Sequence, residues 1–115
     1  MNSAFASEFT KLSKLNDDVQ IALSAISDLV RDNNLKERAN SDEIRTINEI
    51  LIDMTTLMIS INHQLLSLPQ AIASANHNDP KLTQEQLYAL TKATDEEYYR
   101  IRQKLTPIVH LLRPY

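Results

Sequence analysis

The chain has 115 residues, 43% of them hydrophobic and 23% charged, which suits one domain with a modest core and argues against wholesale disorder. It lacks cysteine, which excludes disulfides and thiolate chemistry, and its net charge of −3 disfavours general nucleic-acid binding. It also lacks glycine, which disfavours tight hairpins and phosphate-cradling loops. Aromatic residues make up 5%. With β-branched residues at helical spacing, the composition predicts an all-α protein.

The first third of the chain predicts a long amphipathic helix over about residues 3–32. Apolar residues recur there at alternating steps of four and three. The apolar positions are Phe5, Phe9, Leu12, Val19, Leu23, Ile26 and Val30, and Leu15, Ala22, Ala25 and Leu29 widen the stripe. Asn16 interrupts this stripe, and it either lies at the rim of the helix face or fixes the register of packing. Asn33 and Asn34 are expected to end the helix, because asparagine tolerates the left-handed backbone region.

A second helix is predicted over about residues 42–67, and it is the central one. Asn40 and Glu43 have the spacing of a capping box at its start. Its apolar stripe, widened by Ile50, Leu57 and Leu66, consists of Ile44, Ile47, Leu51, Met54, Met58, Ile61, Leu65 and Leu68. Ile52 and Ile59 lie off this stripe. We therefore expect them to pack on a partner chain or on a second copy, which would make the protein a dimer.

The remainder of the chain predicts one more long helix, over about residues 83–106. Pro69 is expected to stop or kink the central helix, with a short helix near 70–77 after it. The last helix begins either at Pro80, with Asp79 as its cap, or at a Thr83–Gln86 capping box. Pro107 is expected to kink its end. The whole chain, 1–115, is thus predicted to be a single elongated antiparallel bundle of three long helices, or of four elements, with coiled-coil-like packing.

Catalytic chemistry finds little support in the sequence. His63, His77 and His110 have no metal-binding spacing, and no nucleophile motif is present. Asp53 and His63 lie ten residues apart on one helix, about 15 Å along its axis, so they cannot form a dyad. We therefore predict no catalytic residue, no metal ligand and no cofactor. An enzyme with a site assembled across helices, using one of the histidines as base, is the least favoured alternative.

The last helix carries the residues that we expect to bind a partner, namely Tyr88, Tyr99, Arg100 and Arg102. The two tyrosines are eleven residues apart, three near-complete turns, so they share a face. Tyrosine and arginine are typical of interface hot spots. We therefore predict a small non-catalytic protein that binds another protein as an inhibitor, immunity protein, chaperone or adaptor. The alternative is a nucleic-acid or regulatory accessory protein that uses the basic C-terminal helix.

The location of the protein is predicted from two absences. The N-terminal MNSAFASEFTKLSK lacks the basic and apolar regions of a signal peptide. The most apolar stretch, residues 50–69, contains Asp53, Asn62, His63 and Gln64 and keeps a helical rhythm, so membrane insertion is not expected. A soluble, cytoplasmic protein is the resulting expectation.

Overall fold

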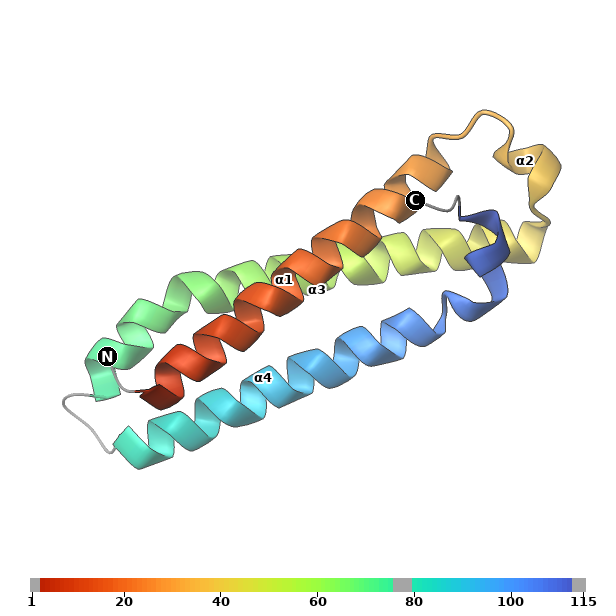
Figure 1. The fold of residues 1–115 in the computed structure, drawn as a ribbon. Coiled ribbons are helices and arrows are strands. Elements are labelled where there is room, and N and C mark those ends of the chain that lie inside the picture. The colour runs from red at the N-terminus through yellow and green to blue at the C-terminus, as the bar shows by residue number, and fades with distance from the viewer. Residues whose placement is uncertain (1–2, 76–79, 113–115) are drawn as a thin grey trace.

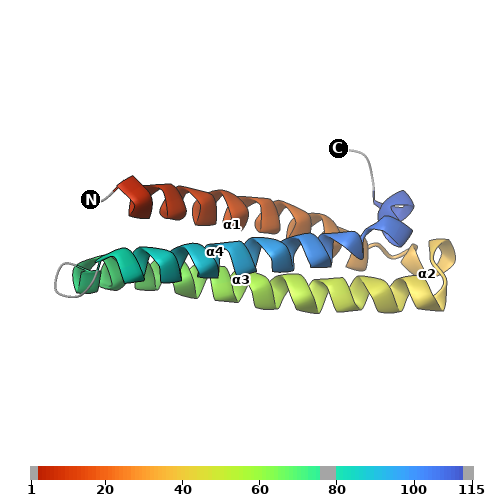
Figure 2. The same cartoon turned by 90° about the horizontal axis from the view of Figure 1, so that it is seen from below.

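The protein is an all-α bundle, as the sequence predicts. The computed structural model describes residues 3–75 and 80–112, and the side chains of 6–67, 70 and 85–112. The elements are α1 (Ser3–Val30), α2 (Leu35–Arg38), α3 (Ser41–Ala75), α4 (Pro80–Gln103) and the 3-10 helix η1 (Thr106–Leu111). Helices α1, α3 and α4 pack side by side, with α3 antiparallel to both others, in a rod of 59 × 19 × 19 Å (Figures 1 and 2). No described helix is long and apolar enough to cross a bilayer.

The core runs along the axis of the rod and is built from the predicted stripes. Its fully buried members are Leu12, Val19, Ile26, Ile47, Ile50, Met54, Ile61, Ile101 and Ile108. On α1, Leu15 and Leu29 are buried, as expected of residues that widen the stripe, whereas the stripe residues Phe9 and Val30 are exposed. A straight helix drifts by about 20° per heptad, which carries the ends of a long stripe away from the core. Asn16 is half-buried, and no described donor reaches its buried Oδ1.

Helix α3 begins with the predicted capping box. The Asn40 N–H donates to Glu43 Oε1 at 3.0 Å, and the Glu43 N–H donates to Asn40 Oδ1 at 2.8 Å. Two backbone donors that the first turn leaves without partners are thus satisfied. Ile50 and Leu57 lie at the centre of the core, but Leu66 is 81% exposed, so its assignment to the buried face was wrong.

Two predicted helix ends were wrong, and of the two predicted starts of the last helix the one at Pro80 was confirmed. Helix α3 continues through Pro69 to Ala75, so residues 70–75 are its last turns and not a separate helix, and the ribbon bends there (Figure 1). Helix α4 begins at Pro80, which places Thr83 inside the helix and removes its predicted capping role. Proline fits the first turn because no hydrogen bond is required of its nitrogen there. The predicted cap Asp79 lies outside the described residues. Helix α4 ends at Gln103, before Pro107.

The connection between α1 and α3 contains the short helix α2, which the sequence did not predict. No described residue has a positive φ, and Asn34 has φ −96°, so the expected left-handed asparagine was wrong. The Asp32 carboxylate organises the turn instead, because Oδ1 accepts the Asn34 N–H at 2.9 Å and Oδ2 pairs with Arg38. Arg38 also donates to the carbonyl of Leu111 at 2.7 Å, which ties η1 to this end of the bundle.

Candidate functional site

The four residues predicted to bind a partner do not form one patch. Tyr88 and Tyr99 are both more than half exposed, and Arg100 and Arg102 are exposed. Tyr88 lies toward α1, where Lys11 Nζ sits 5.8 Å from the centre of its ring. Tyr99 shares that face by helical periodicity. Arg102 also lies on the α1 side, because it follows Asp95, which lines the groove between α1 and α4, by seven residues, close to two helical turns.

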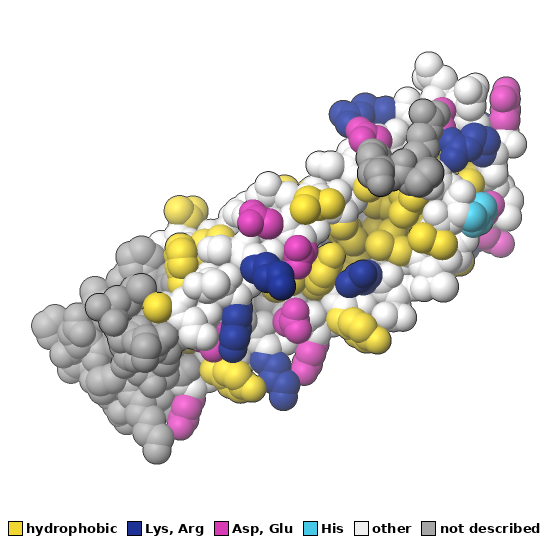
Figure 3. All heavy atoms as spheres, in the orientation of Figure 1, with side chains coloured by type: hydrophobic (Ala, Val, Ile, Leu, Met, Phe, Trp, Pro, Cys, Tyr) yellow, Lys and Arg dark blue, Asp and Glu magenta, His cyan; other side chains and the backbone are white. Residues whose placement is uncertain are grey.

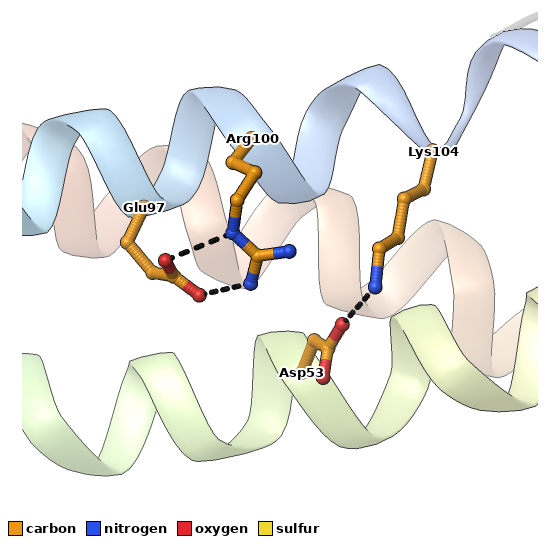
Figure 4. A network of polar contacts seen from close by, with 4 residues as sticks. All are labelled: Asp53, Glu97, Arg100 and Lys104. Carbon is orange, nitrogen blue, oxygen red and sulfur yellow. Dashed lines mark hydrogen bonds and ion pairs between the residues drawn. The ribbon is translucent and has the colours of Figure 1, made fainter.

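Arg100 lies on the opposite side of α4, above the seam with α3. Its Nε donates to Glu97 Oε2 at 3.1 Å, and close by Lys104 Nζ reaches Asp53 Oδ2 at 2.7 Å (Figure 4). The hydrogen bond from Arg100 holds the pKa of Glu97 below its usual value, and the same bond raises the pKa of Arg100. Arg100 therefore belongs to a polar strip along α3 and α4, and its inclusion with the tyrosines was wrong.

A groove of about 370 Å³ runs between α1 and α4 beside Tyr88. Charged side chains of both signs line it, namely Glu8, Lys11, Lys14, Asp18, Lys92 and Asp95. Figure 3 shows this side of the molecule, where basic and acidic side chains alternate along the two helices. We call the groove, together with Tyr88, Tyr99 and Arg102, the α1/α4 face.

Glu8 is the residue of this face that sequence reasoning missed. It is only 8% exposed, and Lys11 Nζ contacts its Oε1 at 3.3 Å. Its Oε2 is buried and meets no hydrogen-bond donor among the described residues. A buried carboxylate oxygen without a donor is costly. The signal was available, because Glu8 precedes Leu12 by four residues and so lies on the same helix face, an acid within an apolar stripe.

The two histidines that the structure describes, His63 and His110, lie apart from one another. His63 is exposed, and His77 lies outside the described residues. His110 does meet a carboxylate, with Nε2 2.9 Å from Glu43 Oε2, but that carboxylate already caps α3 through Oε1. Within the described parts of the chain, no group of three metal-ligating side chains comes together. Asp53 pairs with Lys104, as above, and not with a histidine.

The basic C-terminal residues are likewise divided. Arg100 pairs with Glu97 and Lys104 with Asp53, so two of these cations already meet carboxylates. Arg102 faces the other side of α4, where Asp95, seven residues earlier, lines the groove with α1. Arg113, the fourth basic residue of the segment, lies outside the described residues. This arrangement does not gather the cations into a stripe of the kind that tracks a nucleic-acid backbone.

Comparison of the chain with models of protein families, with curated proteins and with solved structures gave no match.

Proposed function

We propose that this chain is a non-catalytic binding protein that engages another protein through its α1/α4 face. The observation that carries the proposal is the placement of Tyr88, more than half exposed, on a groove whose buried carboxylate, Glu8, has an oxygen without a described donor. Tyr99, also more than half exposed, lies three turns further along the same side of α4. Rigid aromatic side chains around a central pocket are a common arrangement of interface hot spots.

The chemistry of the face suggests what kind of partner it takes. A partner side chain or backbone N–H that enters the groove would complete the hydrogen bonding of Glu8 once the carboxylate turns outward, because Oε2 is buried in the free chain. The tyrosine rings would cover apolar parts of the partner, and the mixed charges of Lys11, Asp18 and Asp95 would select a surface of alternating sign. A polypeptide segment offers all three features. A nucleic acid offers only one sign of charge, and Asp18 and Asp95 would repel it.

The test is an affinity purification from cells with the full chain as bait. The double substitution Tyr88→Ala/Tyr99→Ala should abolish capture of the proteins that the wild-type chain retains, and Glu8→Gln should weaken it. Arg100→Ala is the matched control, because Arg100 is equally accessible on the other side of α4, and it should leave capture unchanged. Capture that survives the double tyrosine substitution would contradict the proposal. Capture lost only with Arg100→Ala would place binding on the α3 side.

A further inference from the structure

Six exposed side chains of α4 form a stripe along the α1/α4 face, and we call them the α4 stripe. They are, in chain order, Glu85, Tyr88, Lys92, Asp95, Tyr99 and Arg102. Steps of three and four residues keep all six within about 100° of one another around the helix. Tyr88, Lys92 and Asp95 line the groove with α1, so the α4 stripe runs along one wall of that groove.

The α4 stripe is complementary to itself when it is turned end for end. In chain order it reads acid, tyrosine, base, acid, tyrosine, base, and in reverse it reads base, tyrosine, acid, base, tyrosine, acid. Two antiparallel copies therefore place an acid opposite every base and a tyrosine opposite every tyrosine. The resulting pairs are Glu85 with Arg102, Tyr88 with Tyr99 and Lys92 with Asp95. All of these pairs share one midpoint, between residues 93 and 94, so a single register satisfies the whole stripe.

Helix α1 repeats the central part of this order on the other wall of the groove. It runs in the same direction as α4 (Figures 1 and 2), and Lys11 Nζ lies over the ring of Tyr88. Seven residues further along each helix, Asp18 and Asp95 both line the groove and are therefore level with each other. Lys14 precedes Asp18 by four residues, so the midpoint of these two lies within about one residue of the midpoint of the α4 stripe. A base followed by an acid thus occupies the same level on both helices.

We propose that the α1/α4 face binds the same face of a second copy of this chain, with α4 antiparallel to α4 and α1 antiparallel to α1. The two-fold axis crosses the groove at the level between residues 93 and 94. The proposal rests on the function proposed above, because it names the partner that this face takes. The face itself offers the alternating charges and the apolar ring surfaces that such a partner needs. In a two-fold interface each contact between unlike residues occurs twice. The ion pairs that would form in this way are Lys92–Asp95, Lys14–Asp18 and Glu85–Arg102.

The charges nearest the axis have no ion-pair partner within the described part of the chain. The ion pairs that the structure describes on α4 lie on its α3 side. Among the described residues, Lys92 and Asp95 form no ion pair although they are one turn apart, and neither do Lys14 and Asp18. These residues can therefore pair across the axis without losing an ion pair inside their own chain.

The same charges disfavour a parallel dimer. A parallel two-fold pair sets α4 of one copy over α1 of the other, because the two helices then exchange places across the axis. Lys92 would face Lys14 and Asp95 would face Asp18, since these residues lie at matching levels of one groove. Like charges in direct opposition are costly, so the face accepts a second copy in the antiparallel arrangement.

Association through this face should be weak and sensitive to salt, because exposed ion pairs are individually weak. Tyr88, Tyr99 and Ile21, which are 54%, 65% and 71% exposed, supply the apolar contact. Ile21 belongs to this face because it follows Lys14 of the groove by seven residues, close to two helical turns. Raising the salt concentration from about 50 mM to about 500 mM should raise the dissociation constant about fivefold, since salt screens exposed charges.

Sedimentation equilibrium of the purified full chain over a wide concentration range tests the proposal. The mass should rise from 13.1 kDa toward twice that value as the concentration increases. Asp95→Lys places two lysines opposite each other on both sides of the axis and should raise the dissociation constant about tenfold or more. Ile59→Glu is the control, because Ile59 is 63% exposed on α3, outside this face, so it should leave the dissociation constant unchanged. A dimer that Ile59→Glu disrupts and Asp95→Lys does not would lie on α3 and overturn the proposal.

A charge exchange between two variants tests the register. Lys92→Asp alone should weaken the dimer as Asp95→Lys does, because it sets aspartate against aspartate. An equimolar mixture of the two variants should dimerise like the wild-type chain, because each lysine then meets an aspartate of the other variant. A mixture that stays as weak as either variant alone would refute the antiparallel register. Circular dichroism of each variant confirms that it is folded, as expected for exposed side chains.

The outcome for the dimer can be separated from the outcome for the function proposed above. A purified wild-type chain that stays monomeric at millimolar concentration overturns the proposal of a second copy. The broader proposal would still stand in that case if Tyr88→Ala/Tyr99→Ala abolishes capture of other proteins from cells. Both proposals fail if the chain is monomeric and capture survives the tyrosine substitutions.

Discussion

Replacing Glu43 by alanine should destabilise the bundle by about 2 kcal/mol, because this one carboxylate serves two parts of the chain. Its Oε1 accepts the Asn40 N–H at 3.0 Å at the start of α3, and its Oε2 lies 2.9 Å from His110 Nε2 in η1. A side-chain cap contributes roughly 1 kcal/mol. The contact with His110, whose side chain is 61% exposed, contributes at most about 1 kcal/mol.

Two other substitutions separate these contributions. Asn40→Ala removes the reciprocal bond to the Glu43 N–H and should cost about 1 kcal/mol while it leaves the His110 contact in place. His110→Ala should cost less than that, because only the contact between η1 and α3 is lost. Glu43→Gln retains an acceptor for the Asn40 N–H, so it should cost less than Glu43→Ala.

Urea unfolding followed by circular dichroism measures these free energies, and each 1 kcal/mol corresponds to roughly 4 °C in thermal midpoint for a chain of this size. The reasoning is refuted if Asn40→Ala changes the unfolding free energy by less than about 0.3 kcal/mol, below the range for helix caps. If Glu43→Ala costs no more than Asn40→Ala, the contact with His110 contributes nothing.

Three further predictions concern the body of the bundle. Burial raises the pKa of Tyr98, so the folded chain favours the neutral phenol. The stability that this contributes is complete below pH about 10 and is lost as the pH rises through the pKa of Tyr98 in the folded chain. Tyr98→Phe should therefore weaken the fall in unfolding free energy above pH about 10, and an identical alkaline slope in both proteins would contradict this. A double-mutant cycle of Asp53→Asn with Lys104→Met should give a coupling of up to about 1 kcal/mol, because both side chains are about one third exposed, and zero coupling would deny the pair a role. Met54→Ala should cost about 3 kcal/mol, because Met54 is fully buried, whereas Ile52→Ala, measured at dilute concentration, should fall within about 0.5 kcal/mol; equal costs would show that the core is misplaced.

Helical periodicity was sufficient to predict the bundle, because its apolar positions and the Asn40–Glu43 cap are local features of the chain. What the sequence could not show was where each stripe is centred. On α3, Ile50 and Leu57 are central because this helix packs on both α1 and α4. A single heptad pattern describes the residues that face one neighbouring helix, and not those that face a second. Pro69 was expected to stop or kink the central helix, and the structure shows the second of these alternatives. The helix continues to Ala75 with a bend, because proline removes one hydrogen bond and need not end a helix.

The candidate site was predicted only in part, for reasons of geometry across helices. Tyr88 and Tyr99 share a face by their spacing alone, and the structure leaves both exposed. Arg100 directly follows Tyr99, so helical spacing already places it about 100° round the helix from that tyrosine. What the sequence does not reveal is that this side of α4 meets α3. The sequence places Glu8 on the apolar face of α1, but it does not show how deeply the side chain is buried. That depends on α4, which packs beside it.

The backbone of the connection between α1 and α3 has a consequence for protein engineering. No described residue uses the left-handed region, so the turn is defined by side-chain bonds of Asp32 and Asn40 and not by a conformation that only glycine adopts freely. The exposed Asn33 between them requires no particular residue type. A label attached to a residue substituted at Asn33 would therefore be displayed at the tip of a 59 Å rod while Asp32 keeps its bond to the Asn34 N–H, which a segment inserted beside Asn33 would break.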